Sequence, residues 1–122
     1  MLSSEEVNIL GQVFNHSFGY SSDTMKVTSS LHGNSLILKY TAVIQFASES
    51  SMEQQKAQHE KDANDCVADA LKKMKAEFKE RAGRSVKVTE DSRDDSVELI
   101  SVSAYTPRKL AYYRMNVHLK VE

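Results

Sequence analysis

Residue types that interrupt or cross-link a chain are scarce in this sequence of 122 residues. It contains one proline, four glycines, one cysteine and no tryptophan. Because Cys66 has no second cysteine to pair with, an internal disulfide is excluded, and a reducing compartment is the simpler expectation. No apolar run approaches the ~20 residues of a membrane-spanning helix, and residues 1–6 are polar and acidic, unlike a signal peptide. We therefore expect a protein that binds no membrane and stays in the cytoplasm, or in a particle assembled there.

An excess of charge of either sign is also missing. The chain has 16 lysine and arginine residues against 17 aspartate and glutamate residues, a net charge of −1. Such a chain has no overall attraction to nucleic acid or anionic lipid, so binding of either kind needs a local basic patch. With 40% hydrophobic and 27% charged residues, the composition fits one globular domain over residues 1–122.

The most distinctive segment, residues 51–82, contains neither glycine nor proline and predicts one long helix. Acids outnumber bases by six to two in residues 49–69, and bases outnumber acids by six to two in residues 70–84. This is the polarity that complements a helix dipole. Apolar residues recur at helical spacing only in the back part of the segment, at Val67, Leu71, Met74 and Phe78.

Both ends of this helix carry capping signals. Ser50 and Glu53 have the spacing of a capping box, and Gly83 suits the position after the last turn. A helix of about 32 residues is ~48 Å long, whereas a compact domain of this size is only about 35 Å across. We therefore expect the polar front of the helix, with Met52 and His59, to project beyond the rest of the molecule.

Strand patterns flank the long helix. Residues 24–32 and 35–47 alternate between apolar and polar side chains, and Gly33 and Asn34 fit a two-residue hairpin turn. Residues 112–121 alternate in the same way. These three segments predict half-buried antiparallel strands.

The chain between the long helix and the last strand is less regular. Residues 86–88 suggest a brief strand, residues 90–95 an acidic turn, and residues 97–104 a strand whose apolar positions change parity at a bulge. The acidic turn could gather a calcium ion, but it lacks the glycine and spacing of a calcium loop. We interpret it as a solvated turn.

The fold class follows from the order of these elements. Residues 4–16 predict a short amphipathic helix, preceded by the capping-box pair Ser3 and Glu6. Helix, hairpin, long helix and meander together predict an α+β fold, in which an antiparallel sheet of four or five strands packs against the long helix.

Motifs for catalysis or cofactor binding are absent from the sequence. No serine stands on a glycine-flanked elbow, and the four histidines are scattered along the chain. His59 is followed four residues later by Ala63, so a helical zinc pair is missing. We expect neither an enzyme nor a bound cofactor or metal, and a small-ligand site ranks third among the hypotheses.

The leading hypothesis concerns apolar residues predicted on the outer sheet face, opposite the long helix. By parity this face carries more β-branched side chains than a fully hydrated surface suits, so either the N-terminal helix or a second subunit covers it. We predict a non-catalytic structural or assembly protein that forms homo-oligomers or docks into a larger particle, a viral particle included. The candidate interface residues are Ile37, Val43, Ile100 and Val102 on the sheet and Met52 and His59 on the long helix.

The alternative hypothesis is a nucleic-acid or anion-binding module, because the same outer face is rich in basic residues. Sheet faces that hold single-stranded RNA use two or three exposed aromatic side chains, and only one is present here. Basic residues also commonly do no more than solvate an open sheet face. The residues concerned are Lys26, Lys39, Tyr112, Arg114, His118 and Lys120.

Overall fold

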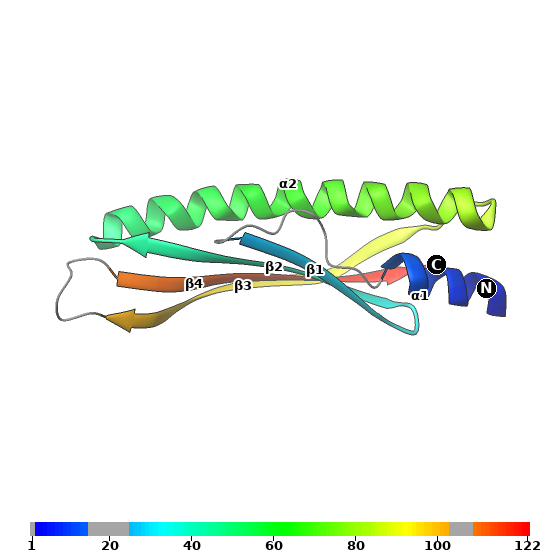
Figure 1. Ribbon diagram of the computed structural model, residues 1–122, viewed down its shortest axis with the longest axis horizontal. Helices are drawn as coiled ribbons and strands as arrows, with labels where there is room; N and C mark the ends of the chain where they lie inside the picture. The colour runs from blue at the N-terminus through cyan, green and yellow to red at the C-terminus, as the bar shows by residue number, and fades with distance from the viewer. Residues whose placement is uncertain (1, 15–24, 103–108) are drawn as a thin grey trace.

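The computed structural model describes residues 2–14, 25–102 and 109–122, and it confirms the predicted α+β fold (Figure 1). Within this part of the chain, four antiparallel strands form one sheet in the order β1-β2-β4-β3. In chain order the elements are α1 (Ser4–Phe14), β1 (Met25–His32), β2 (Ser35–Phe46), α2 (Glu49–Ala82), β3 (Val88–Val102) and β4 (Lys109–Val121). The last strand therefore lies inside the sheet, between β2 and β3.

Both helices lie on the same face of the sheet. α2 packs on β2 and β4, and α1 packs on β1 and on α2. The Ser29 hydroxyl donates a hydrogen bond to the Phe14 carbonyl at 2.7 Å, and Glu6 pairs with Arg84 beyond the end of α2. The core between helices and sheet includes Leu10, Val13, Phe14, Leu36, Leu38, Tyr40, Ile44, Val67, Met74, Phe78, Tyr113 and Val117.

This arrangement shows that one of the two expected ways of covering the outer face, by the N-terminal helix, does not occur. Leu10 and Phe14 of α1 are fully buried in the main core, whereas Val7 is 47% exposed. α1 therefore does not cover the outer face, because its apolar stripe is already occupied on the side where α2 lies.

The capping signals are partly confirmed. The Ser3 and Glu6 box forms in α1, with hydrogen bonds of 2.9 and 3.2 Å. α2 begins two residues earlier than predicted, because the Ser48 hydroxyl and not that of Ser50 accepts from the Ser51 amide. At the other end Gly83 has φ of 79°, the left-handed conformation predicted for it.

The expected projection of the long helix is wrong. α2 has 34 residues, about 51 Å, but the strands beneath it have 12, 13 and 15 residues, about 40–50 Å. The molecule is elongated, so the diameter of a compact sphere is not the relevant length, and α2 runs along the sheet (Figure 1). The front of the helix is also tied down, since Gln55 Nε2 donates to the Gln45 carbonyl at 2.8 Å.

The segment predicted as two strands around an acidic turn is one long edge strand, β3. Two register shifts, between Glu90 and Ser92 and between Leu99 and Ser101, let it continue through the acidic run. Because α2 packs on β2 and β4, the acids of β3 stay exposed while the backbone pairs with β4. The turn at residues 90–95 was predicted wrongly for this reason, and residues 103 and 104 lie outside the described residues.

Candidate functional site

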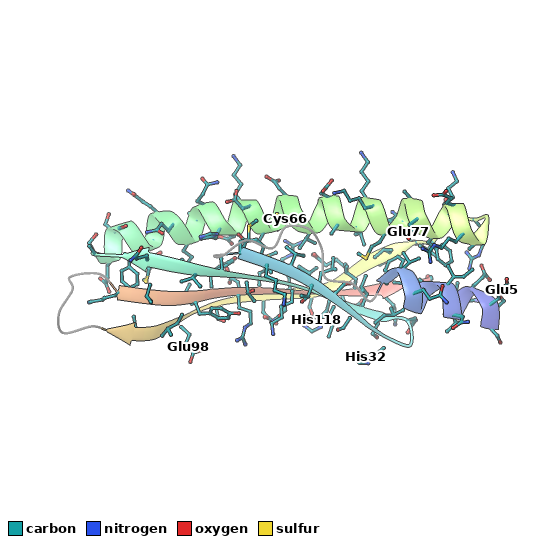
Figure 2. The ribbon with its side chains drawn as sticks, in the orientation of Figure 1. Glu5, His32, Cys66, Glu77, Glu98 and His118 are labelled. Atoms are coloured by element: carbon teal, nitrogen blue, oxygen red, sulfur yellow. The ribbon has the colours of Figure 1, made fainter. Side chains whose placement is uncertain are left out.

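The sheet face turned away from both helices is the main candidate for function, and we call it the open face. None of the described elements packs on it, and Figure 2 shows His32, Glu98 and His118 on this side of the sheet. By strand parity the open face comprises Lys26, Thr28, Ser30 and His32 of β1, Ser35, Ile37, Lys39, Thr41, Val43 and Gln45 of β2, Leu110, Tyr112, Arg114, Asn116, His118 and Lys120 of β4, and Thr89, Ser92, Asp94, Ser96 and Glu98 of β3.

Strand pairing arranges these residues in rows across the sheet. One row consists of Lys26, Thr41, Arg114 and Ser96, and the next of Thr28, Lys39, Asn116 and Asp94. The six residues of the nucleic-acid hypothesis, which are spread over residues 26–120 of the sequence, therefore share this one face.

Charge on the sheet is divided between its strands. The sequences of β1, β2 and β4 contain no acidic residue. β3 has the acids Glu90, Asp91, Asp94, Asp95 and Glu98 and a single cation, Arg93. On the open face, Lys26 and Lys39 lie on β1 and β2, Arg114 and Lys120 lie on β4, and Asp94 and Glu98 lie along the edge formed by β3.

Arg114 occupies the middle of the open face. Its guanidinium carbon lies 5.5 Å from the centroid of the Tyr112 ring, a cation–π distance. Its Nε is buried and has no hydrogen-bond partner within the described part of the chain. Beside it, Asn116 Nδ2 donates to Asp94 Oδ1 at 3.1 Å, and His118 Nε2 lies 3.9 Å from Asp94 Oδ2. Asp94 of the acidic edge strand β3 is thus in contact with Asn116 and His118 of the central strand β4.

Apolar side chains occupy the same face. Ile37, Val43 and Leu110 are half-buried there, although neither of the two described helices packs on this face. Near the end of β3, Leu99 and Ile100 are 54% and 51% exposed. Leu110 was missed by the sequence analysis, although the alternation of residues 112–121 extends to it.

Two of the four sheet residues predicted on the open face, Ile100 and Val102, lie in or after a bulge of β3, and Met52, predicted on the projecting front of the long helix, lies elsewhere. The bulge between Leu99 and Ser101 includes Ile100 and changes the parity of β3, so Val102 shares a row with Lys109 and Phe46 rather than with Val43. Met52 packs against the core between α2 and the sheet, because the front of α2 does not project.

His59 also faces inward. The hydroxyl of Tyr40 lies 2.9 Å from His59 Nδ1, and the rings of His59 and Tyr113 stack with centroids 6.1 Å apart. Tyr113 in turn donates to Asp95 Oδ2 at 3.3 Å. This cluster joins α2, β2, β4 and β3, so the His59 ring contacts the sheet of its own chain.

Burial raises the pKa values of two phenols and one thiol in this region. Burial, followed by the charge of Asp62, raises the pKa of Tyr40 to about 12. Burial, followed by the charge of Asp95, also raises the pKa of Tyr113. The same two causes, burial and Asp62, raise the pKa of the Cys66 thiol, so at neutral pH little reactive thiolate is present.

The described residues offer no evident site for chemistry. They contain no group of three or more histidine, cysteine, aspartate or glutamate side chains placed to hold a metal ion. The surface hollows are shallow, and one of them, on α1, is lined by Ser4, Val7, Asn8, Gly11 and Gln12. Among the helices described, none combines the length and the apolar character needed to cross a membrane.

Comparison with known proteins finds no matching protein family, no similar curated protein and no similar solved structure. What the protein binds is therefore inferred from the open face itself.

Proposed function

We propose that this protein is a non-catalytic assembly component that binds protein surfaces through the open face of its sheet, as a homo-oligomer or docked into a larger particle. The observation that carries this proposal is the face itself. Ile37, Val43 and Leu110 lie on it without a covering element among the described residues. Apolar patches of this kind on soluble proteins mark interaction sites.

The shape of the face supports binding to another protein rather than to a small molecule. Small-molecule sites are concave and enclose most of their ligand, whereas one face of an extended sheet offers a broad surface. Its mixture of aliphatic residues with Tyr112 and Arg114 is also the composition favoured at protein interfaces. A sheet face of this kind pairs with a second sheet across about 10 Å.

Substitution of Val43 by lysine tests the proposal, because it puts a charge in the centre of the apolar part. We expect the wild type to exceed the mass of the 13.7 kDa monomer in light scattering as its concentration rises, and Val43→Lys to remain monomeric. Ala76→Lys adds the same charge on the exposed side of α2 and should behave as wild type. A wild type that is monomeric at every concentration, and in extract of the cells that make it, contradicts the proposal.

A second function, binding of single-stranded nucleic acid, is favoured by one observation. Lys26, Lys39 and Arg114 lie in adjacent rows of the open face, and Lys120 lies on the same face. If phosphates bind there, affinity for an RNA oligonucleotide falls with salt, with a logarithmic slope of about −0.7 for each phosphate neutralised. Arg114→Gln should then weaken binding, while Lys72→Gln on α2 should not. Absence of binding at low salt excludes this function.

A further inference from the structure

We propose that the partner on the open face is a second copy of this chain, related to the first by a two-fold axis that runs parallel to the strands. This inference rests on the proposed function, since it names the partner of the same face. It goes further by fixing which strand of one copy lies over which strand of the other.

The charge division across the sheet supports a second copy as the partner. Acids on the open face are confined to β3, as Asp94 and Glu98, and β1 at the other edge carries Lys26 and no acid. The two edges are three strand spacings apart, about 14 Å. A surface whose two edge strands carry opposite charges is complementary to itself along those edges after a suitable rotation.

A two-fold axis parallel to the strands is that rotation. It places β1 over β3 of the second copy and β2 over β4, and each row then faces the same row of the other copy. Lys26 faces Ser96 of the second copy, between Asp94 and Glu98 on the same strand. Val43 faces Tyr112, so apolar residues meet as well.

No row places two like charges directly opposite each other in this arrangement, although Lys39 faces the position between Arg114 and His118 of the second copy. Lys39 faces Asn116, Arg114 faces Thr41, and Lys120 faces Ser35 of the second copy. An axis perpendicular to the strands instead lays each strand over itself, so that the basic strand β4, with Arg114, His118 and Lys120, opposes its own copy. Repulsion between like charges disfavours that alternative.

The area of the open face is also large enough for a specific dimer interface. Each residue covers roughly 16 Å² of a sheet, and in this arrangement about 8 rows of β1 over β3 and 12 rows of β2 over β4 overlap, which is about 640 Å² per copy. Two copies then bury about 1,300 Å², within the range of standard specific interfaces.

Cysteine cross-linking between the edge strands tests the arrangement. Ser30 of β1 and Ser92 of β3 lie in one row and are predicted to face each other across the interface. Ser30→Cys and Ser92→Cys are made separately in a Cys66→Ala background. They are mixed, then joined by a short bis-methanethiosulfonate reagent, because facing sheets lie about 10 Å apart and a direct disulfide needs Cα atoms within about 7 Å. We expect the mixed dimer to form much faster than either homodimer. Equal rates, or a faster Ser30→Cys homodimer, overturn the proposed axis.

Charge inversion provides an independent measurement that needs no cross-link. Lys26→Glu and Asp94→Lys should each weaken self-association by roughly two- to fivefold, as loss of an exposed ion pair does. The double variant inverts both edges and should return to within about twofold of wild type. If the double variant is weaker than both single variants, the arrangement is excluded.

The two proposals fail in different ways. A monomeric wild type removes both of them. A wild type that associates, and that Val43→Lys dissociates, retains the open face as an interface. If the mixed cross-link and the charge compensation are then absent, only the two-fold arrangement is wrong.

Discussion

The hydroxyl of Tyr40 lies 2.9 Å from Nδ1 of His59, which joins the middle of the sheet to the front third of α2. The stacking of His59 on Tyr113 adds a contact to β4. Few apolar residues anchor this part of the helix, so these polar and aromatic contacts hold it on the sheet.

His59→Ala should therefore destabilise the protein by about 1–3 kcal/mol, because it removes the hydrogen bond and the ring contact together. His32 provides a matched control, since it is an exposed histidine at the hairpin end of β1. His32→Ala should change the free energy of unfolding by less than about 0.5 kcal/mol. Urea denaturation measures both variants, and equal midpoints for the two contradict the assigned role.

Alkaline pH should destabilise the fold through the buried phenols. The pKa of Tyr40 is raised from 10.0 to about 12. The unfolded chain therefore loses this proton at lower pH than the folded protein does. The stabilisation that comes from the neutral Tyr40 phenol is fully present below pH 10.0 and is lost as the pH rises toward about 12. Tyr113, whose pKa is also raised, contributes in the same direction. Denaturation series across this range should show the fall, and Tyr40→Phe should show less of it.

Acid should weaken the junction between α1 and the end of α2. The Ser3 amide, followed by Arg84, lowers the pKa of Glu6 from 4.5 to about 2. The stabilisation by this carboxylate is therefore present above pH 4.5 and is lost as the pH falls toward about 2. Glu6→Gln should melt at a lower temperature than wild type at neutral pH. The difference in melting temperature between the two proteins should disappear as the pH falls toward about 2. A constant difference between pH 4.5 and about 2 contradicts the stabilising role of the Glu6 carboxylate.

Two glycines give opposite predictions for the same substitution. Gly83→Ala should destabilise the protein by about 1 kcal/mol, because φ of 79° is unfavourable for alanine. Gly11→Ala lies within α1 and has open space at its Cβ position, so it should stabilise α1 by up to about 1 kcal/mol. Thermal melting of the two variants checks both signs.

Local signals predicted most of the fold. The alternation in β1 and β2, the turn at Gly33 and the uninterrupted helix all depend on neighbouring residues, and the structure confirms them. The extent of β3 could not be predicted from neighbouring residues in the sequence. Its acidic run resembles a turn, and only pairing with β4 and the position of α2 over other strands make it a strand.

The candidate face was predicted in part for the same reason. The parity of β2 and β4 places Ile37, Val43 and the basic residues correctly, since alternation fixes the face of each side chain. Met52 and His59 were placed wrongly because helix length was compared with a sphere rather than with the strands. Asp94 was missed because it belongs to the segment interpreted as a turn, and Glu98 was missed because only the apolar positions of the strand at residues 97–104 were considered.

The strand order β1-β2-β4-β3 determines when the sheet can form during synthesis of the chain. The hairpin of β1 and β2 and the later strand β3 have no direct pairing with each other, and both wait for β4. A ribosome must therefore release residues 109–121 before the two halves can join. Until then, α2 can pack on β2 but not on β4. The incompletely synthesised chain is therefore the state most exposed to proteases and chaperones.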